Sequence, residues 1–416
     1  MLTNAPRGTK DMLPAEAHKW HFSENEFRTL CARYGFKEMR TPVFEHTELF
    51  TRGVGDTTDI VQKEMYTWTQ ADRSLTLRPE GTSPVVRAFV EHKLYAEPQP
   101  SKFYYDIPCF RYEKPQSGRL REFHQFGAEI FGTNNMMADS DVIALAYDFI
   151  NDLGISDVEL QINSIGCPVC RDNYRKALRA FLEPVYDQLC DTCKDRYDRN
   201  PMRILDCKSP DDQELVKGAP VMLDYLCEEC ETAFTDLKSN LDAMEMKYVV
   251  NPGIVRGLDY YTKTAFEFIT TSIGAQGTVC GGGRYDHLSE ELGGPPIPGV
   301  GFGMGKERLL LLMEANGIEI PQPQGPDAFI AFMGEEGKAF GLKLMSTLRN
   351  EGLNVEMDCM ARNLKGQFKY ADRLKVKNTI IIGEDELKNG VVAIRNMEES
   401  EQRLVPFAEI VGELKK

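Results

Sequence analysis

Residues 101–132 read S-K-F-Y-Y-D-I-P-C-F-R-Y-E-K-P-Q-S-G-R-L-R-E-F-H-Q-F-G-A-E-I-F-G, and this stretch decides the fold. Its two halves alternate apolar and polar residues around a polar, basic loop, which is typical of two antiparallel strands joined by a long connection. On the second strand Gln125, Gly127 and Glu129 share one side, and the apolar residues at 126, 128 and 130 share the other. We therefore expect a sheet with one apolar face and one charged face.

The first strand is expected to extend to Glu113 and to repeat this division. Arg111 and Glu113 would lie on the charged side, with Phe110 and Tyr112 on the apolar side. One solvated face is common in antiparallel sheets and is the simpler explanation. A face that carries Arg, Gln, Glu and a small Gly is instead typical of a surface that binds a ligand. Arg119 and Arg121 in the loop add positive charges suited to a polyphosphate.

Length and charge narrow the class of protein. The chain has 416 residues, 42% hydrophobic and 27% charged, which indicates two or three domains with a substantial core. Its 49 basic and 64 acidic residues give a net charge of −15, of which only −1 falls from residue 326 onward. The acidity argues against nonspecific coating of nucleic acid but permits local contact with RNA.

The sequence predicts a cytoplasmic protein without a membrane span. Its apolar runs are far shorter than the roughly 18 residues that cross a bilayer, and its start lacks a signal-peptide core. Its eleven cysteines should therefore stay reduced.

The order of predicted elements indicates an α+β fold with three parts. A helix at 15–34 and a strand at 36–40 open a catalytic domain expected over 1–166 and 241–320. A helical, cysteine-rich insertion is expected at 167–240. After a proline-rich linker, residues 326–416 read as a small α/β domain. One of its helices carries basic residues three or four apart, either a solvated face or an RNA contact, at Arg362, Lys365, Lys369 and Arg373.

Seven cysteines gather in the insertion: Cys167, Cys170, Cys190, Cys193, Cys207, Cys227 and Cys230. Three C-x-x-C pairs are typical of a structural zinc site, for which thiolates are preferred ligands. The pair 167/170 could join 190/193 or 227/230, with Cys207 as a spare ligand. The alternative is a set of reduced cysteines that only pack between helices.

Glycine-rich motifs do not match the common nucleotide loops. Gly299, Gly301, Gly303 and Gly305 precede Lys306, but Glu307 follows where a P-loop needs Ser or Thr. The G-x-G-x-x-G dinucleotide fingerprint is also absent from the sequence. Polar ligand groups lie instead beside small residues in T-L-R-P-E-G-T-S (76–83), R-G-L-D-Y-Y (256–261) and C-G-G-G-R-Y-D (280–286).

Taken together, these motifs resemble the histidyl-tRNA synthetases of bacterial type, which are class II aminoacyl-tRNA synthetases. F-R-Y-E to E-F-H-Q-F-G-A-E resembles class II motif 2, and G-V-G-F-G-M-G-K-E-R-L resembles motif 3. The early helix, strand and Pro42 resemble motif 1, which builds the dimer interface in that family. R-G-L-D-Y-Y and G-G-R-Y-D resemble the two elements particular to the histidine enzymes, and the C-terminal domain resembles an anticodon-binding domain.

The resemblance implies the roles of individual residues. ATP, with Mg²⁺, would contact Arg111, Glu113, Arg119, Arg121 and Arg308. L-histidine would contact Glu80, Thr82, Gln125, Glu129, Arg256, Tyr260, Tyr261 and Tyr285, with Glu129 and Tyr261 on the two imidazole nitrogens. Arg256 and Arg111 would be catalytic. The expected activity is the formation of histidyl-adenylate and transfer of histidine to tRNA(His) by a homodimer, with zinc in the insertion as a further cofactor.

Two alternatives stay open at this point. One is a catalytically silent paralogue, such as the regulatory subunit of an ATP phosphoribosyltransferase, although such proteins lack the C-terminal domain. The other is a class II enzyme for another amino acid, which R-G-L-D-Y-Y argues against.

Overall fold

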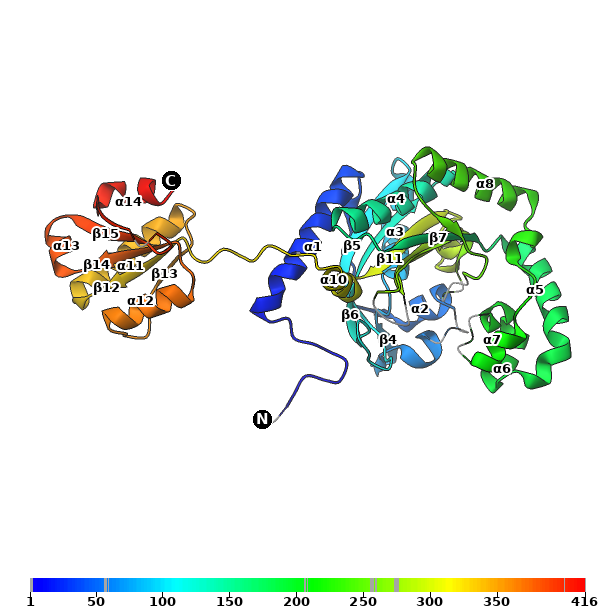
Figure 1. Ribbon diagram of the computed structural model, residues 1–416. Helices are drawn as coiled ribbons and strands as arrows, with labels where there is room; N and C mark the ends of the chain where they lie inside the picture. Colours follow the sequence, from blue (N-terminus) through cyan, green and yellow to red (C-terminus); the bar gives the residue numbers. More distant parts are fainter. Residues whose placement is uncertain are drawn as a thin grey trace. The chain divides into compact units, whose positions relative to one another are not determined.

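A computed structural model describes residues 3–55, 58, 60–205, 207, 209–254, 258, 260–272, 277–399 and 401–415. The chain forms two compact units, Met1–Ile320 and Pro321–Lys416. The predicted α+β class is confirmed: a large, mostly antiparallel sheet flanked by helices dominates the first unit (Figure 1). No helix in the described part of the chain is long and apolar enough to cross a membrane.

Eight strands build the central sheet of the first unit. In spatial order they are β1 (Lys37–Glu38), β5 (Ser101–Phe110), β6 (Glu122–Phe131), β11 (Gly299–Gly305), β10 (Thr278–Arg284), β9 (Thr262–Ile269), β7 (Glu159–Ser164) and β8 (Val249–Val250). The six inner strands are antiparallel, and the short edge strands β1 and β8 pair in parallel. The predicted hairpin of residues 101–132 is therefore confirmed as β5 and β6.

The first strand of this hairpin ends earlier than the alternation predicts. β5 stops at Phe110, because the next residues turn away: the amide of Tyr112 donates to the carbonyl of Glu64 at 2.7 Å. Tyr112 is exposed rather than part of an apolar face. Arg111 and Glu113 therefore belong to the loop after β5, where strand parity no longer decides their direction.

One face of the sheet carries the main hydrophobic core. Helices α1 (Pro14–Arg33), α4 (Met136–Asp152), α8 (Glu228–Ala243) and α10 (Lys306–Ala315) contribute to it. Phe27 of α1 packs against Phe126 of β6 and Phe149 of α4, with ring centroids 4.5 and 5.0 Å apart. The apolar side of β6, residues 126, 128 and 130, is buried here as predicted.

The opposite face is not simply charged, as the sequence led us to expect. Helices α3 (Thr82–Glu91) and α9 (Leu288–Glu291) cover part of it and form a second hydrophobic core with β5. Beside them lie α2 (Thr47–Gly53) and a small sheet of β2 (Phe44–His46), β4 (Arg73–Leu77) and β3 (Thr67–Gln70). Polar site residues on this face thus project between apolar neighbours, which exclude water from them.

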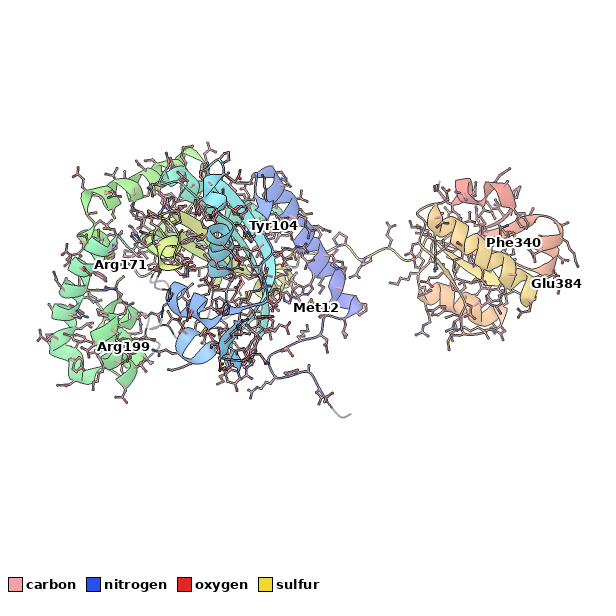
Figure 2. The ribbon with its side chains drawn as sticks, turned by 180° about the vertical axis from the view of Figure 1, so that it is seen from behind. Met12, Tyr104, Arg171, Arg199, Phe340 and Glu384 are labelled. Carbon is pink, nitrogen blue, oxygen red and sulfur yellow. The ribbon has the colours of Figure 1, made fainter. Side chains whose placement is uncertain are left out.

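The insertion is helical, as predicted. It contains α5 (Pro168–Leu182), α6 (Asp191–Arg199), α7 (Pro210–Leu215) and α8, and between Ser164 and Val249 its described residues form no strand. Helices α5 to α7 lie at the end of the unit away from α1 (Figure 1). From behind, Arg171 and Arg199 mark this end, and Met12 lies on the other side of the unit (Figure 2).

The second unit is a separate α/β domain. Its sheet has the order β13 (Val355–Met357), β12 (Ala328–Phe332), β14 (Asn378–Ile382), β15 (Val391–Asn396) and β16 (Gln402–Pro406). Its helices are α11 (Gly334–Asn350), α12 (Leu364–Arg373), α13 (Glu384–Lys388) and α14 (Ile410–Leu414). Sequence reasoning missed β16, an edge strand that buries only Val405 and so shows no alternation.

The basic face of α12 is smaller than its sequence spacing indicates. Lys365, Lys369 and Arg373 are exposed. Arg362 precedes the helix and is held by an ion pair with Asp358 and by the ring of Tyr370. Three basic side chains rather than four are thus available on this surface.

Candidate active site

A fully buried carboxylate, Glu129 of β6, lies at the centre of the candidate site. Thr82 donates its hydroxyl hydrogen to Oε1 at 2.8 Å, and Tyr105 donates to the same oxygen at 3.1 Å. Tyr285 donates to Oε2. Burial raises the pKa of the Glu129 carboxyl to about 8, although these hydroxyls oppose the shift. Three hydroxyl groups from different segments thus converge on one buried carboxyl group.

Glycines of β11 leave the space that this carboxylate occupies. A Cβ at Gly301 would overlap Oε2 of Glu129, and a Cβ at Gly303 would overlap the side-chain amide of Gln125. The alternate residues 300, 302 and 304 face the main core. The glycine-rich motif, which does not match a phosphate loop, is therefore a strand. The glycines on one of its faces leave room for the side chains of Gln125 and Glu129.

Tyr105 is a site residue that sequence reasoning missed. Its ring lies under Gly81 and Gly127, where a Cβ at either glycine would overlap it. The register pairs Tyr105 directly with Gly127, so both face the same side of the sheet. A bulky aromatic residue opposite a glycine in the predicted hairpin was the available signal.

Three of the side chains predicted to contact histidine form one network with Glu129. Glu80 accepts hydrogen bonds from the backbone amides of Thr82 and Ser83 at 2.7 and 2.9 Å, which caps the start of α3. Gln125 accepts from the amide of Gly81 at 3.2 Å. The structure thus brings Glu80 and Thr82 together with Gln125 and Glu129 of β6, more than 40 residues further along the chain.

Three tyrosines form one wall of the pocket. The ring of Tyr260 lies 4.6 Å from that of Tyr261 and 5.6 Å from that of Tyr285, and all three side chains are buried. The carbonyl of Tyr261 accepts from Arg171 of α5 at 3.1 Å, which ties this wall to the insertion. Arg256, predicted as a catalytic residue in the same motif, lies outside the described residues.

The arginines predicted to bind ATP surround Glu113. Arg119 forms an ion pair with this carboxylate, and Arg111 lies 3.8 Å from it. Arg111 also donates to the carbonyl of Pro79 at 2.8 Å, which fixes its guanidinium. Arg121 stacks on the ring of Tyr112 at 3.8 Å and donates to the carbonyl of Glu113.

Arg308 joins this group from α10. Its guanidinium donates to the carbonyl of Thr278 at 2.7 Å. Burial and then the positive charge of Arg119 lower the pKa of Arg308, so the two cations are close enough to repel each other. Four guanidinium groups with a single central carboxylate form an excess of positive charge suited to a polyphosphate.

Arg284, singled out in the G-G-R-Y-D motif, has a structural role instead. It is fully buried and forms ion pairs with Asp139 of α4 and with Asp286 at 3.2 Å. Its neighbour Tyr285 is the member of the motif that reaches Glu129.

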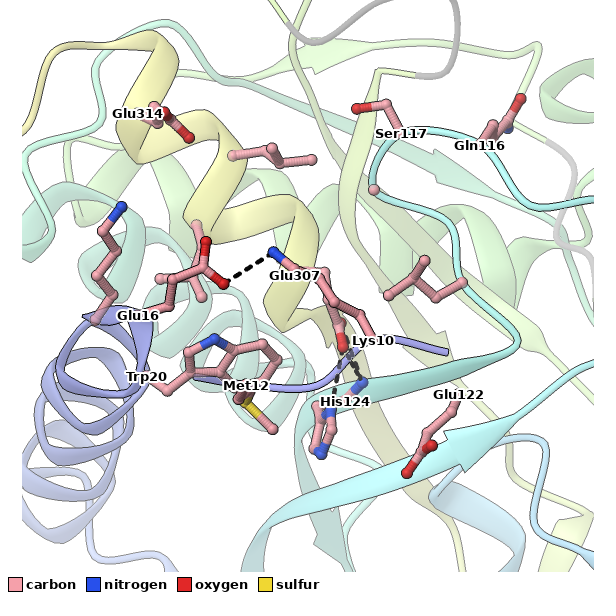
Figure 3. Close-up of a pocket in the computed structure, with 15 residues that line it drawn as sticks. Lys10, Met12, Glu16, Trp20, Gln116, Ser117, Glu122, His124, Glu307 and Glu314 are labelled. Atoms are coloured by element: carbon pink, nitrogen blue, oxygen red, sulfur yellow. Dashed lines mark hydrogen bonds and ion pairs between the residues drawn. The ribbon is translucent and has the colours of Figure 1, made fainter. Parts of the chain in front are cut away.

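A separate pocket of about 340 Å³ lies behind the loop of residues 114–121 (Figure 3). Its lining includes Lys10, Trp20, His124 and Glu307; the rings of Trp20 and His124 lie 4.9 Å apart, and Glu307 accepts from the amide of His124 at 2.9 Å. None of the predicted histidine or ATP residues lines it.

The cysteines of the insertion form two clusters. The first cluster is Cys167, Cys170, Cys227 and Cys230, and the second is Cys190, Cys193, Cys207 and Asp212. In each, the ligand atoms lie within 4.8 Å of one another, as a metal site requires. Of the two pairings that the sequence left open, the structure places 167/170 with 227/230, and 190/193 forms a group with Cys207 and a carboxylate not predicted.

Comparisons with known proteins agree with this geometry. The histidyl-tRNA synthetase family matches residues 8–182 and 188–309, and the anticodon binding domain family matches residues 327–416. The histidine–tRNA ligases of Caldanaerobacter subterraneus subsp. tengcongensis and Clostridioides difficile are 58% and 54% identical, covering this whole chain and 100% and 99% of theirs.

Solved structures show the same likeness. The crystal structure of apo S. aureus histidyl-tRNA synthetase has a TM-score of 0.86 at 40% identity, with full coverage of both chains. A Bacillus halodurans protein described as an ATP phosphoribosyltransferase regulatory subunit/histidyl-tRNA synthetase has a TM-score of 0.65 at 21% identity, which shows a shared fold alone.

Proposed function

This chain belongs to the histidyl-tRNA synthetase family, and we propose that its Glu129 pocket recognises L-histidine beside an ATP site formed by the arginines around Glu113. The protein is a histidine–tRNA ligase: it activates histidine with ATP, releases pyrophosphate and transfers histidine to the 3′ end of tRNA(His). The observation that carries the pocket assignment is the convergence of three hydroxyls on one buried carboxylate.

The chemistry of this carboxylate accounts for selection of histidine. We assign Glu129 and Tyr261 to the two imidazole nitrogens, with Glu80, Thr82 and Gln125 on the α-ammonium group. A leucine or phenylalanine side chain would leave the buried Glu129 without a polar partner from the ligand. Pockets that select by hydrogen bonding discriminate by on the order of 10⁴ or more, so a separate editing site is not needed.

The arginines account for the activation step. Attack of the histidine carboxylate on the α-phosphate brings two anions together, and negative charge grows on the nonbridging oxygens. Arg111 is held by the carbonyl of Pro79 and Arg308 by that of Thr278, so both are oriented before ATP binds. Such fixed cations stabilise the transition state without reorganisation. Mg²⁺ would enter with ATP and offset the charge of the departing pyrophosphate.

The assignment of Arg256 completes the mechanism. We propose that it bridges the histidine carboxylate and the α-phosphate, as the family resemblance implies. Arg256→His should then abolish histidine-dependent ATP–pyrophosphate exchange and weaken histidine binding less. Near-normal exchange in this variant would refute the role. Exchange by the unaltered enzyme with histidine, compared with other amino acids, tests the function itself, and equal rates with leucine would contradict the proposal.

The contacts with tRNA and a second subunit are also proposals. The exposed Lys365, Lys369 and Arg373 support contact of the C-terminal domain with the anticodon. Exposed Val43, Phe44 and Trp68 beside the motif 1 segment support a homodimer, because large apolar side chains gathered on a surface mark interfaces. Light scattering on the full-length protein should give twice the chain mass, and a monomer would contradict this assignment. We place the enzyme in the cytoplasm, where ATP, histidine and tRNA are available.

A structural zinc ion in the first cysteine cluster is the remaining cofactor proposal. Sγ of Cys167 lies 3.5 Å from that of Cys170 and 3.9 Å from that of Cys227. Four thiolates at about 2.3 Å from a tetrahedral zinc would lie about 3.8 Å apart, so the side chains fit the ion. The ion would join the starts of α5 and α8, where the chain leaves and re-enters the catalytic domain.

A further inference from the structure

The second cysteine cluster offers a different set of ligands from the first. Cys190 precedes α6 and Cys193 lies in its first turn, while Cys207 comes from the segment leading into α7 and Asp212 from the first turn of α7. Sγ of Cys190 lies 3.9 Å from Sγ of Cys207, which in turn lies 3.1 Å from Oδ2 of Asp212. The sulfur separation is about twice the 2 Å of a disulfide and close to that of two zinc ligands.

Asp212 is the unusual member because it is a buried carboxylate among thiols. Only 1% of its surface is exposed. Its hydrogen bonds come from the amide of Cys190 at 3.1 Å and from the thiol of Cys207. Among the residues that the structure describes, no lysine or arginine forms an ion pair with it. Burial of a carboxylate is costly unless a counter-charge is present, and a divalent ion among these ligands would supply it.

The hydrophobic core of the insertion near this cluster is small. Four of the eleven buried residues in its local core are cysteines, and its helices α6 and α7 have nine and six residues. Segments of this size with a small core usually need disulfides or a metal. The cysteines of the insertion are free thiols, which leaves a metal as the cross-link.

The two clusters differ in what they contact. Beside the first cluster, Lys263 donates its amide to the carbonyl of Gly166 at 3.0 Å and forms an ion pair with Glu229 at 2.8 Å. Near the second cluster, two hydrogen bonds join helices of the insertion to each other: Arg179 of α5 donates to the carbonyls of Tyr197 and Asp198 of α6 at 3.2 and 2.8 Å. The first cluster is thus connected to the tyrosine wall of the pocket through Lys263 and Arg171.

We propose that Cys190, Cys193, Cys207 and Asp212 form a second structural zinc site, independent of the first, so that the insertion holds two zinc ions per chain. The second ion stabilises the insertion alone, and histidine activation does not depend on it. Loss of the first ion, in contrast, should disturb the pocket. Lys263 and Arg171 connect the two, because Arg171 donates to the carbonyl of Tyr261 and Lys263 pairs with Glu229.

Metal analysis of the full-length protein, purified without chelator, tests the proposal. We expect two zinc ions per chain in the unaltered protein, one in Asp212→Asn, and two again in Asp212→Cys, where a thiolate replaces the carboxylate. Cys359→Ser, which removes an exposed cysteine outside both clusters, should leave two. One zinc in the unaltered protein that survives Asp212→Asn would overturn the second site, and no zinc at all would overturn both sites.

Activity provides an independent readout of the division between the sites. Asp212→Asn should leave kcat and KM for histidine in ATP–pyrophosphate exchange within about twofold, while Cys227→Ser should raise KM for histidine. If Asp212→Asn does not fold, Co²⁺ titration of the metal-free unaltered protein decides instead. Tetrahedral Co²⁺ absorption that saturates at two ions per chain would support the proposal, and saturation at one would overturn it. The ligase function is tested separately by the ATP–pyrophosphate exchange assay, and its outcome does not depend on the number of zinc ions found.

Discussion

The Glu129 pocket and the second cysteine cluster both bury a carboxylate, but they hold it in place differently. Glu129 lies in the middle of β6, which is bonded to β5 on one side and to β11 on the other. Asp212 lies on a six-residue helix in a segment without strands among its described residues. Two neighbouring strands thus fix the backbone that carries the first carboxylate, whereas a short helix carries the second, which is held by the amide of Cys190 and the thiol of Cys207.

This difference bears on the roles proposed for the two sites: the Glu129 pocket is expected to be formed before its ligand binds, and the cysteine cluster is expected to need its metal ion to be stable. In the proposed histidine pocket, three hydroxyl groups donate to Glu129 in the absence of a ligand, which keeps this carboxylate in place. In the cluster, thiols and one amide are the partners of Asp212. Substitutions that disturb the sheet should therefore affect catalysis, while loss of the cluster should affect the local stability of the insertion.

The largest effect is expected from Gly301→Ala. Its Cβ would overlap Oε2 of Glu129 and press on the carbonyl of Ala128, which the sheet cannot move aside. Displacement of a binding group by about 1 Å can cost on the order of 100-fold in rate, so we expect a loss of at least about this size in histidine-dependent exchange.

Gly305→Ala is the matched control on the same strand. A Cβ there would lie 3.7 Å or more from Arg308, which is ordinary van der Waals contact. Its activity should stay close to that of the unaltered enzyme. If both variants lose activity equally, the close fit of Glu129 against β11 is not what shapes the pocket.

A smaller effect concerns the pH dependence of stability. The pKa of Glu129 is raised to about 8 in the folded protein by burial, compared with about 4.5 when unfolded. The unfolded state therefore binds fewer protons between these values, and the stability contributed by the neutral carboxyl is lost as the pH rises from about 4.5 to about 8.

Glu129→Gln removes this titration, so its stability relative to the unaltered protein should rise over that window by about 1.4 kcal/mol per pH unit. Urea unfolding of both proteins without histidine, from pH 5 to pH 8, measures the difference. A constant difference would show that Glu129 is ionised throughout.

The sequence predicted the facing of side chains best where the backbone is regular. Alternation along residues 122–131 correctly separated Gln125 and Glu129 from the core side chains of β6. The same rule failed for Tyr112, because the chain leaves the sheet after Phe110 to bond with Glu64, a contact between distant segments. Periodicity carries no information about such a contact.

Residues whose role depends on a distant partner were harder to predict. Arg284 looks like a ligand group in its motif, and only its burial against Asp139, 145 residues away, shows that it is structural. Asp212 belongs to no C-x-x-C pair, and it joins the cysteines only when α7 folds back on α6. The C-x-x-C spacing identified the candidate cysteine ligands, but only the fold shows which of them lie together in each cluster.

Blocking the imidazole nitrogens of the substrate one at a time tests the central claim most directly. We assign one nitrogen to Glu129 and the other to Tyr261, so methylation of either should remove a hydrogen bond and place a methyl group against a buried polar side chain. ATP–pyrophosphate exchange should be measured with L-histidine, 1-methylhistidine and 3-methylhistidine under the same conditions. The proposed pocket predicts that both methylated amino acids lose at least about 100-fold in kcat/KM, since each unpaired buried group costs about 1 to 3 kcal/mol beyond the steric clash. Activation of either methylhistidine at a rate close to that of histidine would contradict it.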